Sequence, residues 1–384
     1  MSVQAPSSSP RQDRVNRGLR VLFALPGLHR VSRGAELALE SVAHHLTNSN
    51  GFRVTMVGSG TSRPGAPYEY KRAGCISREH FERWPSVPYL RGHYAYEELT
   101  FAPGLWQSYS PEDFEATVTC GYPYTSWILR HGRSNGAPRH IFVTQNGDWM
   151  ATARNWEFKH FSCDGLICVN PEHYERHRER WNCALIPNGV DTALFHPGAG
   201  DREQFGLPPS VPIVLMVAAL IPSKRVLEGI RAVARLDGVH LAIAGDGDLR
   251  ASVAELGRSL LGERFHQFNV SGQTIPELYR CADAVLHMSM DESFGNVYIE
   301  ALATGLPVIA HETQTTRWIL ENFGQLIDTR DEQAVVTALQ QALASPRDAQ
   351  TVIRISSAAR RFAWSEIAVR YGEFIRDVCN SNRP

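Results

Sequence analysis

Hydrophobic residues occur in short apolar runs that alternate with longer segments carrying an apolar stripe. Residues 20–25 form a mostly apolar run that ends at Pro26 and Gly27, which is typical of a buried strand. Residues 34–46 repeat leucine, valine and alanine at helical spacing, and residues 52–57 form a second apolar run. The pattern predicts a strand, a helix and a strand in succession.

The same alternation continues to the end of the chain and becomes more regular after Pro208. Strands that alternate with helices are typical of a parallel, doubly wound sheet, so the C-terminal half is predicted to be Rossmann-like and the fold class α/β. The further predicted strands are residues 116–120, 140–145, 165–170, 213–218, 240–244, 265–270, 284–288, 307–310 and 325–327.

A chain of 384 residues is long enough for two domains. Residues 1–18 lack apolar content and are predicted to be a disordered tail. We predict an N-terminal domain at 19–190 and, because of its proline and glycine, a linker at 191–212. The C-terminal domain is predicted at 213–362, followed by a helix at 363–384 that packs back on the N-terminal domain.

The alternation is lost between residues 60 and 115, which are predicted to be a long irregular insertion. Such insertions are often binding loops. Aromatic faces suit sugar rings or lipids, but the loops could equally be packed by their own side chains. The aromatic residues in question are Trp84, Tyr89, Tyr94, Tyr96, Phe101 and Trp106.

Composition narrows the function classes. Charged residues make up 21% of the chain and no apolar run approaches the ~18 residues of a membrane-spanning helix. A net charge of −1 gives no strong attraction to nucleic acid, although a small basic bias in the N-terminal half could favour peripheral contact with the inner face of a membrane. Seven cysteines without a C-x-x-C pair indicate neither a disulfide framework nor a zinc site. We expect a cytoplasmic protein.

The segment 291–302 carries the candidate chemistry. Glu292 follows a predicted strand, Gly295 lies where a helix begins, and Glu300 lies on the second turn. Amides at the start of a helix bind a diphosphate, and a carboxylate one turn further can accept hydrogen bonds from both hydroxyls of a ribose. The alternative is that both glutamates only benefit from the helix dipole.

The string E-S-F-G-x-x-x-x-E-A at 292–301 resembles the E-x7-E motif of glycosyltransferase family 4. Further landmarks of that family follow in order: I-P-N-G-V-D at 186–191, G-x-G at 245–247, L-Y-x-x-A-D at 278–283 and F-x-W at 362–364. The resemblance is good over about 186–380 and loose in the N-terminal half.

The resemblance implies a GT-B fold, in which two Rossmann-like domains face each other across a cleft. It implies a retaining, metal-independent hexosyltransferase without a cofactor, which uses a UDP- or GDP-linked sugar as its co-substrate and a glycan, lipid-linked or small-molecule acceptor. The donor would be held by Gly34, Lys224, Arg225, Glu292, Ser293, Phe294, Gly295, Asn296 and Glu300. Glu292, Lys224 and Asp148 would be the catalytic residues, with Asn146 and Asp148 on the acceptor side.

Two positions depart from the family pattern. Ala218 and Ala219 replace the usual Gly-Arg, so one phosphate-binding cation is missing, and Arg225 is the candidate substitute. Asn146 replaces a histidine near the reacting centre. Asp148 is a candidate replacement base, with an ordinary turn residue as the alternative.

Two further motifs resemble the binding motifs of other protein classes. The D-x-D at 246–248 resembles a metal-binding motif, but it follows a predicted strand, which favours a turn. The G-x-G at 245–247 lacks the third glycine of a dinucleotide-binding fingerprint. The competing functions are an epimerase or phosphorylase of the same fold and a non-catalytic nucleotide-sugar binder.

Overall fold

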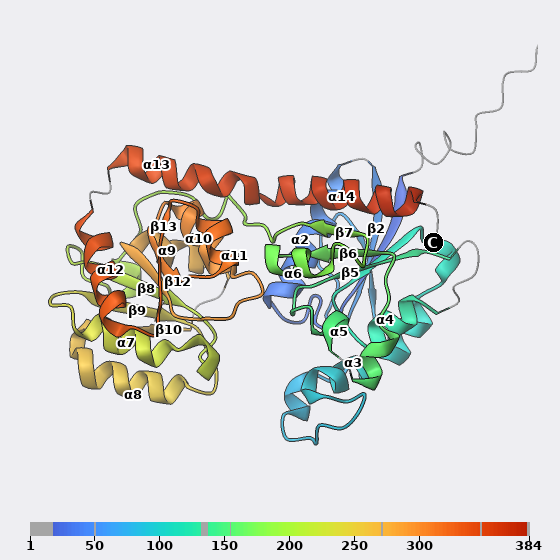
Figure 1. Ribbon diagram of the computed structural model, residues 1–384, viewed down its shortest axis with the longest axis horizontal. Coiled ribbons are helices and arrows are strands. Elements are labelled where there is room, and N and C mark those ends of the chain that lie inside the picture. Colours follow the sequence, from blue (N-terminus) through green and yellow to red (C-terminus); the bar gives the residue numbers. More distant parts are fainter. Residues whose placement is uncertain are drawn as a thin grey trace, which may run out of the picture. The chain divides into compact units, whose positions relative to one another are not determined.

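The computed structural model describes residues 18–49, 51–131, 137–153, 155–269, 272–345 and 348–381. Except for Gly18, the predicted disordered tail lies outside these residues. The chain divides into two compact units, Met1–Pro187 with Trp364–Pro384 and Asn188–Ala363 (Figure 1).

The N-terminal unit is built on a seven-stranded sheet in which all pairings are parallel. The strand order is β3-β2-β1-β4-β5-β6-β7, so the chain order reverses between β1 and β4. The strands are β1 (Leu19–Ala24), β2 (Phe52–Gly58), β3 (Glu69–Arg72), β4 (Ala116–Thr119), β5 (Arg139–Val143), β6 (Gly165–Cys168) and β7 (Cys183–Leu185).

The helices of this unit include the last helix of the chain, α14 (Trp364–Asn380), which packs against α2 (Gly34–Asn48). Its buried residues, such as Ile367, Tyr371 and Ile375, repeat at helical spacing and form one apolar face. The other helices are α3 (Gly92–Ser108), α4 (Tyr124–Leu129), α5 (Trp149–Thr152), α6 (Pro171–His177), η1 (Arg78–Phe81), η2 (Pro111–Asp113) and η3 (Trp156–His160).

The C-terminal unit has a six-stranded parallel sheet in the order β10-β9-β8-β11-β12-β13, which reverses between β8 and β11. Apolar residues of α7 and α12 cover its strands and form the core. The strands are β8 (Ile213–Val217), β9 (His240–Ala244), β10 (Phe265–Phe268), β11 (Ala284–His287), β12 (Val308–His311) and β13 (Gly324–Ile327). The helices are α7 (Val226–Ala234), α8 (Arg250–Leu261), α9 (Ile275–Cys281), α10 (Asn296–Thr304), α11 (Gln314–Leu320), α12 (Glu332–Ala344), α13 (Ala349–Ala358), η4 (Glu203–Phe205), η5 (Pro222–Lys224), η6 (Gly262–Arg264) and η7 (Ala359–Phe362).

The segment 191–212, predicted to be a linker, lies within the C-terminal unit. The guanidinium of Arg202 donates hydrogen bonds to Asp283 and to the carbonyl of Cys281, which fix the segment to the end of α9. The units divide at Pro187 and again at Ala363. The prolines and glycines that suggested a linker therefore mark turns in this segment, and do not indicate a free chain.

The predicted irregular insertion at 60–115 also needs correction, because it contains β3 and the 17-residue helix α3. Pro103 lies inside α3, which hid its helical pattern. Tyr96 and Phe101 are buried, as the packing alternative requires, whereas Trp84 and Trp106 are exposed. Across the described ranges, no helix has both the length and the apolar character needed to cross a membrane.

Candidate active site

Lys224 and Glu292 meet at the carboxyl edge of the C-terminal sheet. Lys224 closes η5, which follows β8, and Glu292 lies in the loop after β11. These two strands are neighbours at the point where the strand order reverses, which is where open α/β sheets bind ligands. Lys224 Nζ lies 2.5 Å from Glu292 Oε1. The fold therefore joins two predicted site residues that are 68 positions apart.

The carboxylate of Glu292 is held in its ionised form. Burial by itself would raise its pKa, but the hydrogen bond from His287 and the charges of His287 and Lys224 outweigh burial and lower the pKa to about 2. His287 Nε2 lies 2.8 Å from Glu292 Oε1 and donates to it in the tautomer that carries the proton on Nε2. Glu292 is thus a fixed negative charge at neutral pH.

The N-terminus of α10 lies a few residues beyond Glu292. Gly295 precedes the helix with φ +88°, and no side chain caps the helix. A Cβ on Gly295 would lie 2.3 Å from the ring of Tyr298, so the position excludes larger residues. The first amides of a helix have no intrahelical partner and favour anions. The side chain of Phe294 is buried against Trp318 and Phe362, so only its backbone could face a ligand there.

Glu300 lies on α10, beyond its first turn, and its environment is the opposite of that of Glu292. The hydroxyl of Tyr279 donates to Glu300 Oε2 at 2.8 Å. Burial raises the pKa of Glu300 to about 7, although the Tyr279 hydrogen bond opposes the shift. Glu300 therefore changes its protonation state near neutral pH.

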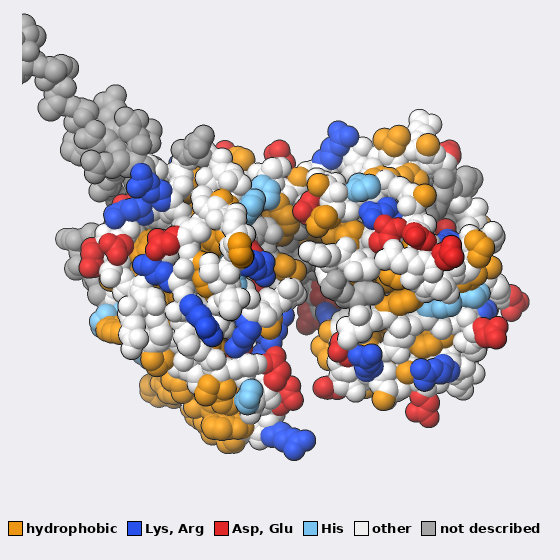
Figure 2. Space-filling view, turned by 180° about the vertical axis from the view of Figure 1, so that it is seen from behind, with side chains coloured by type: hydrophobic (Ala, Val, Ile, Leu, Met, Phe, Trp, Pro, Cys, Tyr) orange, Lys and Arg blue, Asp and Glu red, His pale blue; other side chains and the backbone are white. Residues whose placement is uncertain are grey.

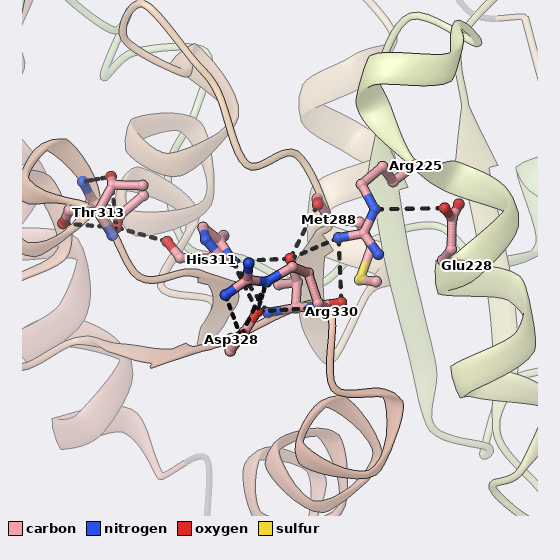
Figure 3. A network of polar contacts seen from close by, with 9 residues as sticks. Arg225, Glu228, Met288, His311, Thr313, Asp328 and Arg330 are labelled. Atoms are coloured by element: carbon pink, nitrogen blue, oxygen red, sulfur yellow. Dashed lines mark hydrogen bonds and ion pairs between the residues drawn. The ribbon is translucent and has the colours of Figure 1, made fainter.

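Arg225, the candidate substitute for the missing cation, does not join the Lys224–Glu292 pair. Its Nη1 donates to the carbonyl and hydroxyl oxygens of Thr329 at 3.3 and 3.1 Å, and its Nε to Glu228 at 3.4 Å. Figure 3 shows Arg225 between Glu228 and the backbone of Met288. Its backbone is left-handed, with φ +52°, so its side chain departs in a different direction from that of Lys224. Arg225 thus stabilises the ends of the strands.

The glycines of the G-x-G motif allow close backbone approach. A Cβ on Gly245 would lie 1.8 Å from the carbonyl oxygen of Ala218. Asp246 Oδ1 accepts hydrogen bonds from the amide of Gly247 at 3.0 Å and from Arg250 at 3.3 Å, as expected of a turn. Within the residues that the structure describes, no three histidine, cysteine, aspartate or glutamate side chains gather as metal ligands.

The predicted acceptor-side residues and Gly34 belong to the N-terminal unit. Gly34 is the exposed first residue of α2. Asn146 is exposed, and its carbonyl oxygen accepts a hydrogen bond from the indole of Trp149 at 3.1 Å. The structure thus leaves the Asn146 side chain near the surface of a turn.

Asp148, a candidate base, is buried in an ion-pair cluster. Arg176 Nη1 lies 2.5 Å and His177 Nε2 2.8 Å from Asp148 Oδ2. Burial would raise its pKa, but His177, His173 and Arg176 outweigh burial and lower the pKa to about 2. A carboxylate stabilised in this way is a weak proton acceptor at neutral pH.

Sequence reasoning missed several residues that shape the site, namely His287, Tyr279 and Thr329. His287 ends a strand that is otherwise apolar, and a polar side chain in such a place needs a buried partner. That signal could have indicated its bond to Glu292. Asn188, which lies in the I-P-N-G-V-D landmark, donates to Asn296 Oδ1 at 3.0 Å.

Comparison with known families matches each half of the chain to a separate family model. Residues 199–361 match the family model for glycosyl transferases group 1, and residues 32–194 match the model for Glycosyltransferase Family 4. Among solved structures, sucrose-phosphate synthase from Thermosynechococcus elongatus aligns with a TM-score of 0.75 and 21% identity over 94% of this chain and 99% of that chain. Anabaena HepE in complex with UDP-glucose aligns with a TM-score of 0.69 and 18% identity over 94% and 100%.

Curated relatives match over shorter stretches. The lipopolysaccharide core biosynthesis glycosyltransferase LpsE of Rhizobium meliloti is 31% identical over 186 residues, which are 47% of this chain and 54% of that protein. The D-inositol 3-phosphate glycosyltransferase of Mycolicibacterium gilvum is 31% identical over 236 residues, or 56% and 53%. The chain thus spans about half the length of these relatives. It belongs to glycosyltransferase family 4 and has the GT-B fold.

Proposed function

We propose that this glycosyltransferase moves a hexosyl group from a nucleoside diphosphate sugar to the hydroxyl of a glycan, lipid-linked or small-molecule acceptor, with retention of configuration and without a metal ion. The observation that carries the proposal is the Lys224–Glu292 pair beside the uncapped start of α10. A cation beside the uncapped N-terminus of a helix, at the edge of a parallel sheet, is suited to a diphosphate.

Each part of the donor has a candidate partner. The amides at the start of α10 and the ammonium of Lys224 would bind the diphosphate, and the carboxylate of Glu300 would accept hydrogen bonds from the ribose hydroxyls. Lys224 has three N–H donors, so it can contact a phosphate while it stays paired with Glu292. The complex of HepE with UDP-glucose makes a UDP-linked hexose the first donor to test, with a GDP-linked hexose second.

The proposed chemistry needs a cation more than it needs a protein base. As the bond between sugar C1 and the phosphate oxygen breaks, negative charge grows on the leaving diphosphate, and a positioned ammonium stabilises that charge most in the transition state. The acceptor oxygen bonds to C1 on the same face, and its proton passes to the leaving phosphate oxygen. This route fits an exposed Asn146 and an ion-paired Asp148.

The test is donor turnover by the whole chain. Release of nucleoside diphosphate from UDP-glucose or GDP-mannose, with NMR of the product's anomeric proton, distinguishes the candidate functions. A product with retained configuration supports the proposal. A free epimerised sugar formed without an acceptor would indicate an epimerase. Formation of a sugar phosphate when inorganic phosphate is added would indicate a phosphorylase. Saturable binding without turnover would indicate a nucleotide-sugar binder.

Metal independence is tested separately with excess EDTA. We expect turnover to persist, since helix amides and Lys224 are proposed to hold the diphosphate. Loss of activity that manganese restores would overturn this part and direct attention to Asp246 and Asp248. We further propose a cytoplasmic location, which the seven free cysteines support.

A further inference from the structure

His287 is a buried polar side chain at the end of an otherwise apolar strand. It is the last residue of β11, and its side chain is 5% exposed, whereas several histidine side chains reach the molecular surface in Figure 2. Burying an imidazole costs free energy unless its nitrogens find partners. Nε2 meets this need by donating to Glu292 Oε1 at 2.8 Å. The place of His287 therefore indicates a role in the candidate site more than in the core.

Two hydrogen-bond donors converge on one oxygen of Glu292. Lys224 Nζ lies 2.5 Å and His287 Nε2 2.8 Å from Oε1. In the part of the chain that the structure describes, no hydrogen bond reaches Oε2, and the Glu292 side chain keeps 16% exposure. An oxygen with two donors has no lone pair to spare, whereas the other oxygen can still accept from a ligand. The carboxylate is thus held in one orientation, with Oε2 available.

The imidazole of His287 is itself oriented by α10. The rings of His287 and Tyr298 meet edge to face, with their centroids 5.2 Å apart and an angle of 84° between them. Tyr298 is 1% exposed, and its ring also lies against Gly295, where an added Cβ would come within 2.3 Å of it. The helix whose N-terminus is proposed to bind the diphosphate therefore also directs Nε2 of His287 toward Glu292.

The contact with His287 affects the charge of Glu292 as well as its orientation. Burial opposes ionisation of Glu292, and the hydrogen bond from His287, with the charges of His287 and Lys224, outweighs burial in lowering the pKa. The titratable groups that face Glu292 are Lys224 of η5, His287 of β11 and Tyr298 of α10, whose own pKa is raised by burial and by the charge of Glu292. Loss of His287 should therefore raise the pKa of Glu292.

We propose that His287 is a positioning residue for sugar transfer, which holds the Glu292 carboxylate so that Oε2 stays open to the sugar nucleotide and Lys224 stays available to the diphosphate. The inference rests on the proposed function and adds to it a residue that acts through Glu292. A second donor to Oε1 weakens the attraction of Glu292 for the Lys224 ammonium, whose other N–H groups can then contact phosphate. Without His287, the ammonium is drawn toward Glu292 and away from the leaving group.

The first test is the release of UDP from UDP-glucose by the full chain, after cooperative unfolding of each variant has been verified. His287→Leu cannot donate a hydrogen bond and should lower kcat about tenfold to hundredfold, with donor KM within about threefold of wild type. His287→Gln carries an amide donor close to the place of Nε2 and should keep kcat within about threefold of wild type. His140→Leu is the matched control and should leave kcat unchanged, because His140 is also buried in a strand, β5 of the N-terminal unit, where it bonds to Thr117 and Ser126.

Two pH measurements separate positioning from general support of the fold. At saturating UDP-glucose, kcat of His287→Leu should fall on the acid side at a higher pH than that of wild type, because protonation of Glu292 removes the partner of Lys224. NMR of carbon-13-labelled carboxyl groups measures the titration of Glu292 without turnover, with its signal identified by comparison with Glu292→Gln. The midpoint should move to higher pH in His287→Leu and stay close to that of wild type in His287→Gln.

The outcomes distinguish this inference from the proposed function. Absence of wild-type turnover would overturn the proposed reaction, and the NMR titration would still decide whether His287 controls Glu292. An unchanged kcat or an unmoved Glu292 midpoint in folded His287→Leu would overturn the positioning role. Equal losses of kcat in His287→Gln and His287→Leu, or a loss in His140→Leu as large as that in His287→Leu, would overturn it as well and leave His287 a part of the core.

Discussion

Glu292 in the C-terminal unit and Asp148 in the N-terminal unit are held in similar ways. Each carboxylate accepts from one histidine and pairs with one cation, and each has a pKa lowered to about 2. They differ in position. Glu292 follows β11, at the reversal of strand order beside β8, whereas Asp148 follows β5, which lies inside the run β4-β5-β6. Similar electrostatics therefore do not imply a similar role, and the sheet topology distinguishes them.

The surroundings of the two carboxylates differ as well. Glu292 lies beside the uncapped first turn of α10, so an anion could still be accommodated there. Asp148 has Arg176, His177 and His173 around its two oxygens, the last at 3.7 Å, and precedes a helix of only four residues. The cluster of Glu292 is open to a ligand, whereas that of Asp148 is closed by its own partners.

The largest expected effect separates the two cations. Lys224→Met should lower kcat by about 10² to 10³, because it removes one preorganised charge from the leaving diphosphate. Arg176→Met removes the corresponding cation of Asp148 and should change kcat less than about threefold. Both variants are compared by steady-state donor kinetics after cooperative unfolding has been verified. Wild-type kcat in Lys224→Met would remove its proposed role.

The next effect concerns donor affinity and Glu300. Glu300→Gln should weaken UDP-glucose binding by about 1.5 to 3 kcal/mol, the usual contribution of hydrogen bonds to a charged group. With a pKa of about 7 in the free protein, Glu300 ionises as the pH rises, so wild-type affinity should increase roughly tenfold between pH 6 and pH 8 and then level off. Calorimetric titration checks both, and the variant should show no such pH dependence. A pH-independent wild type would place the ribose elsewhere.

The sequence predicted most strands of both sheets and the strand-loop-helix that carries Glu292 and Glu300. Those parts follow from local signals, since apolar runs and a glycine at the start of a helix act within a few residues. It did not predict α3, because Pro103 lies within that helix, nor that residues 191–212 are fixed through Arg202. Contacts between distant segments decide such cases.

Prediction of the candidate site from the sequence is limited in the same way. Lys224 and Glu292 were each predicted, yet the protonation states that separate Glu292 from Glu300 depend on His287 and Tyr279, which local spacing does not connect to them. Arg225 and Asp148 were predicted as replacements for residues that the family pattern lacks here, and that pattern does not reveal their surroundings. Their partners, Thr329 and Arg176, come from other elements.

A smaller effect tests the support of the site, as opposed to its chemistry. Thr329 accepts from Arg225 and donates to the carbonyl of Met288 at 3.2 Å, so it links the segment after Lys224 to the end of β11. Thr329→Val should reduce kcat severalfold through a less well-placed Lys224, with donor KM nearly unchanged. Arg225→Met should reduce kcat in the same way. The kcat of Arg225→Gly should decrease less, because glycine suits the left-handed backbone at this position. A loss in Arg225→Met as large as that in Lys224→Met would assign the diphosphate contact to Arg225.

The smallest effect on activity is expected for Asp148, where stability should change instead. Asp148→Asn should leave kcat within about twofold of wild type, whereas loss of a general base costs about 10² or more. The folded protein lowers the pKa of Asp148 from 3.8 to about 2, so its stabilisation is present above about pH 4 and is lost as the pH falls toward 2. At pH 7 the free energy of unfolding of the variant should be about 2 kcal/mol lower than that of the wild type. This difference should shrink as the pH is lowered from about 5 to 3. Urea unfolding of both proteins across this range measures it, with Glu172→Gln on the same helix α6 as a control. A large loss of kcat at unchanged stability would restore Asp148 as a base and would make the two carboxylates alike in function as well as in charge.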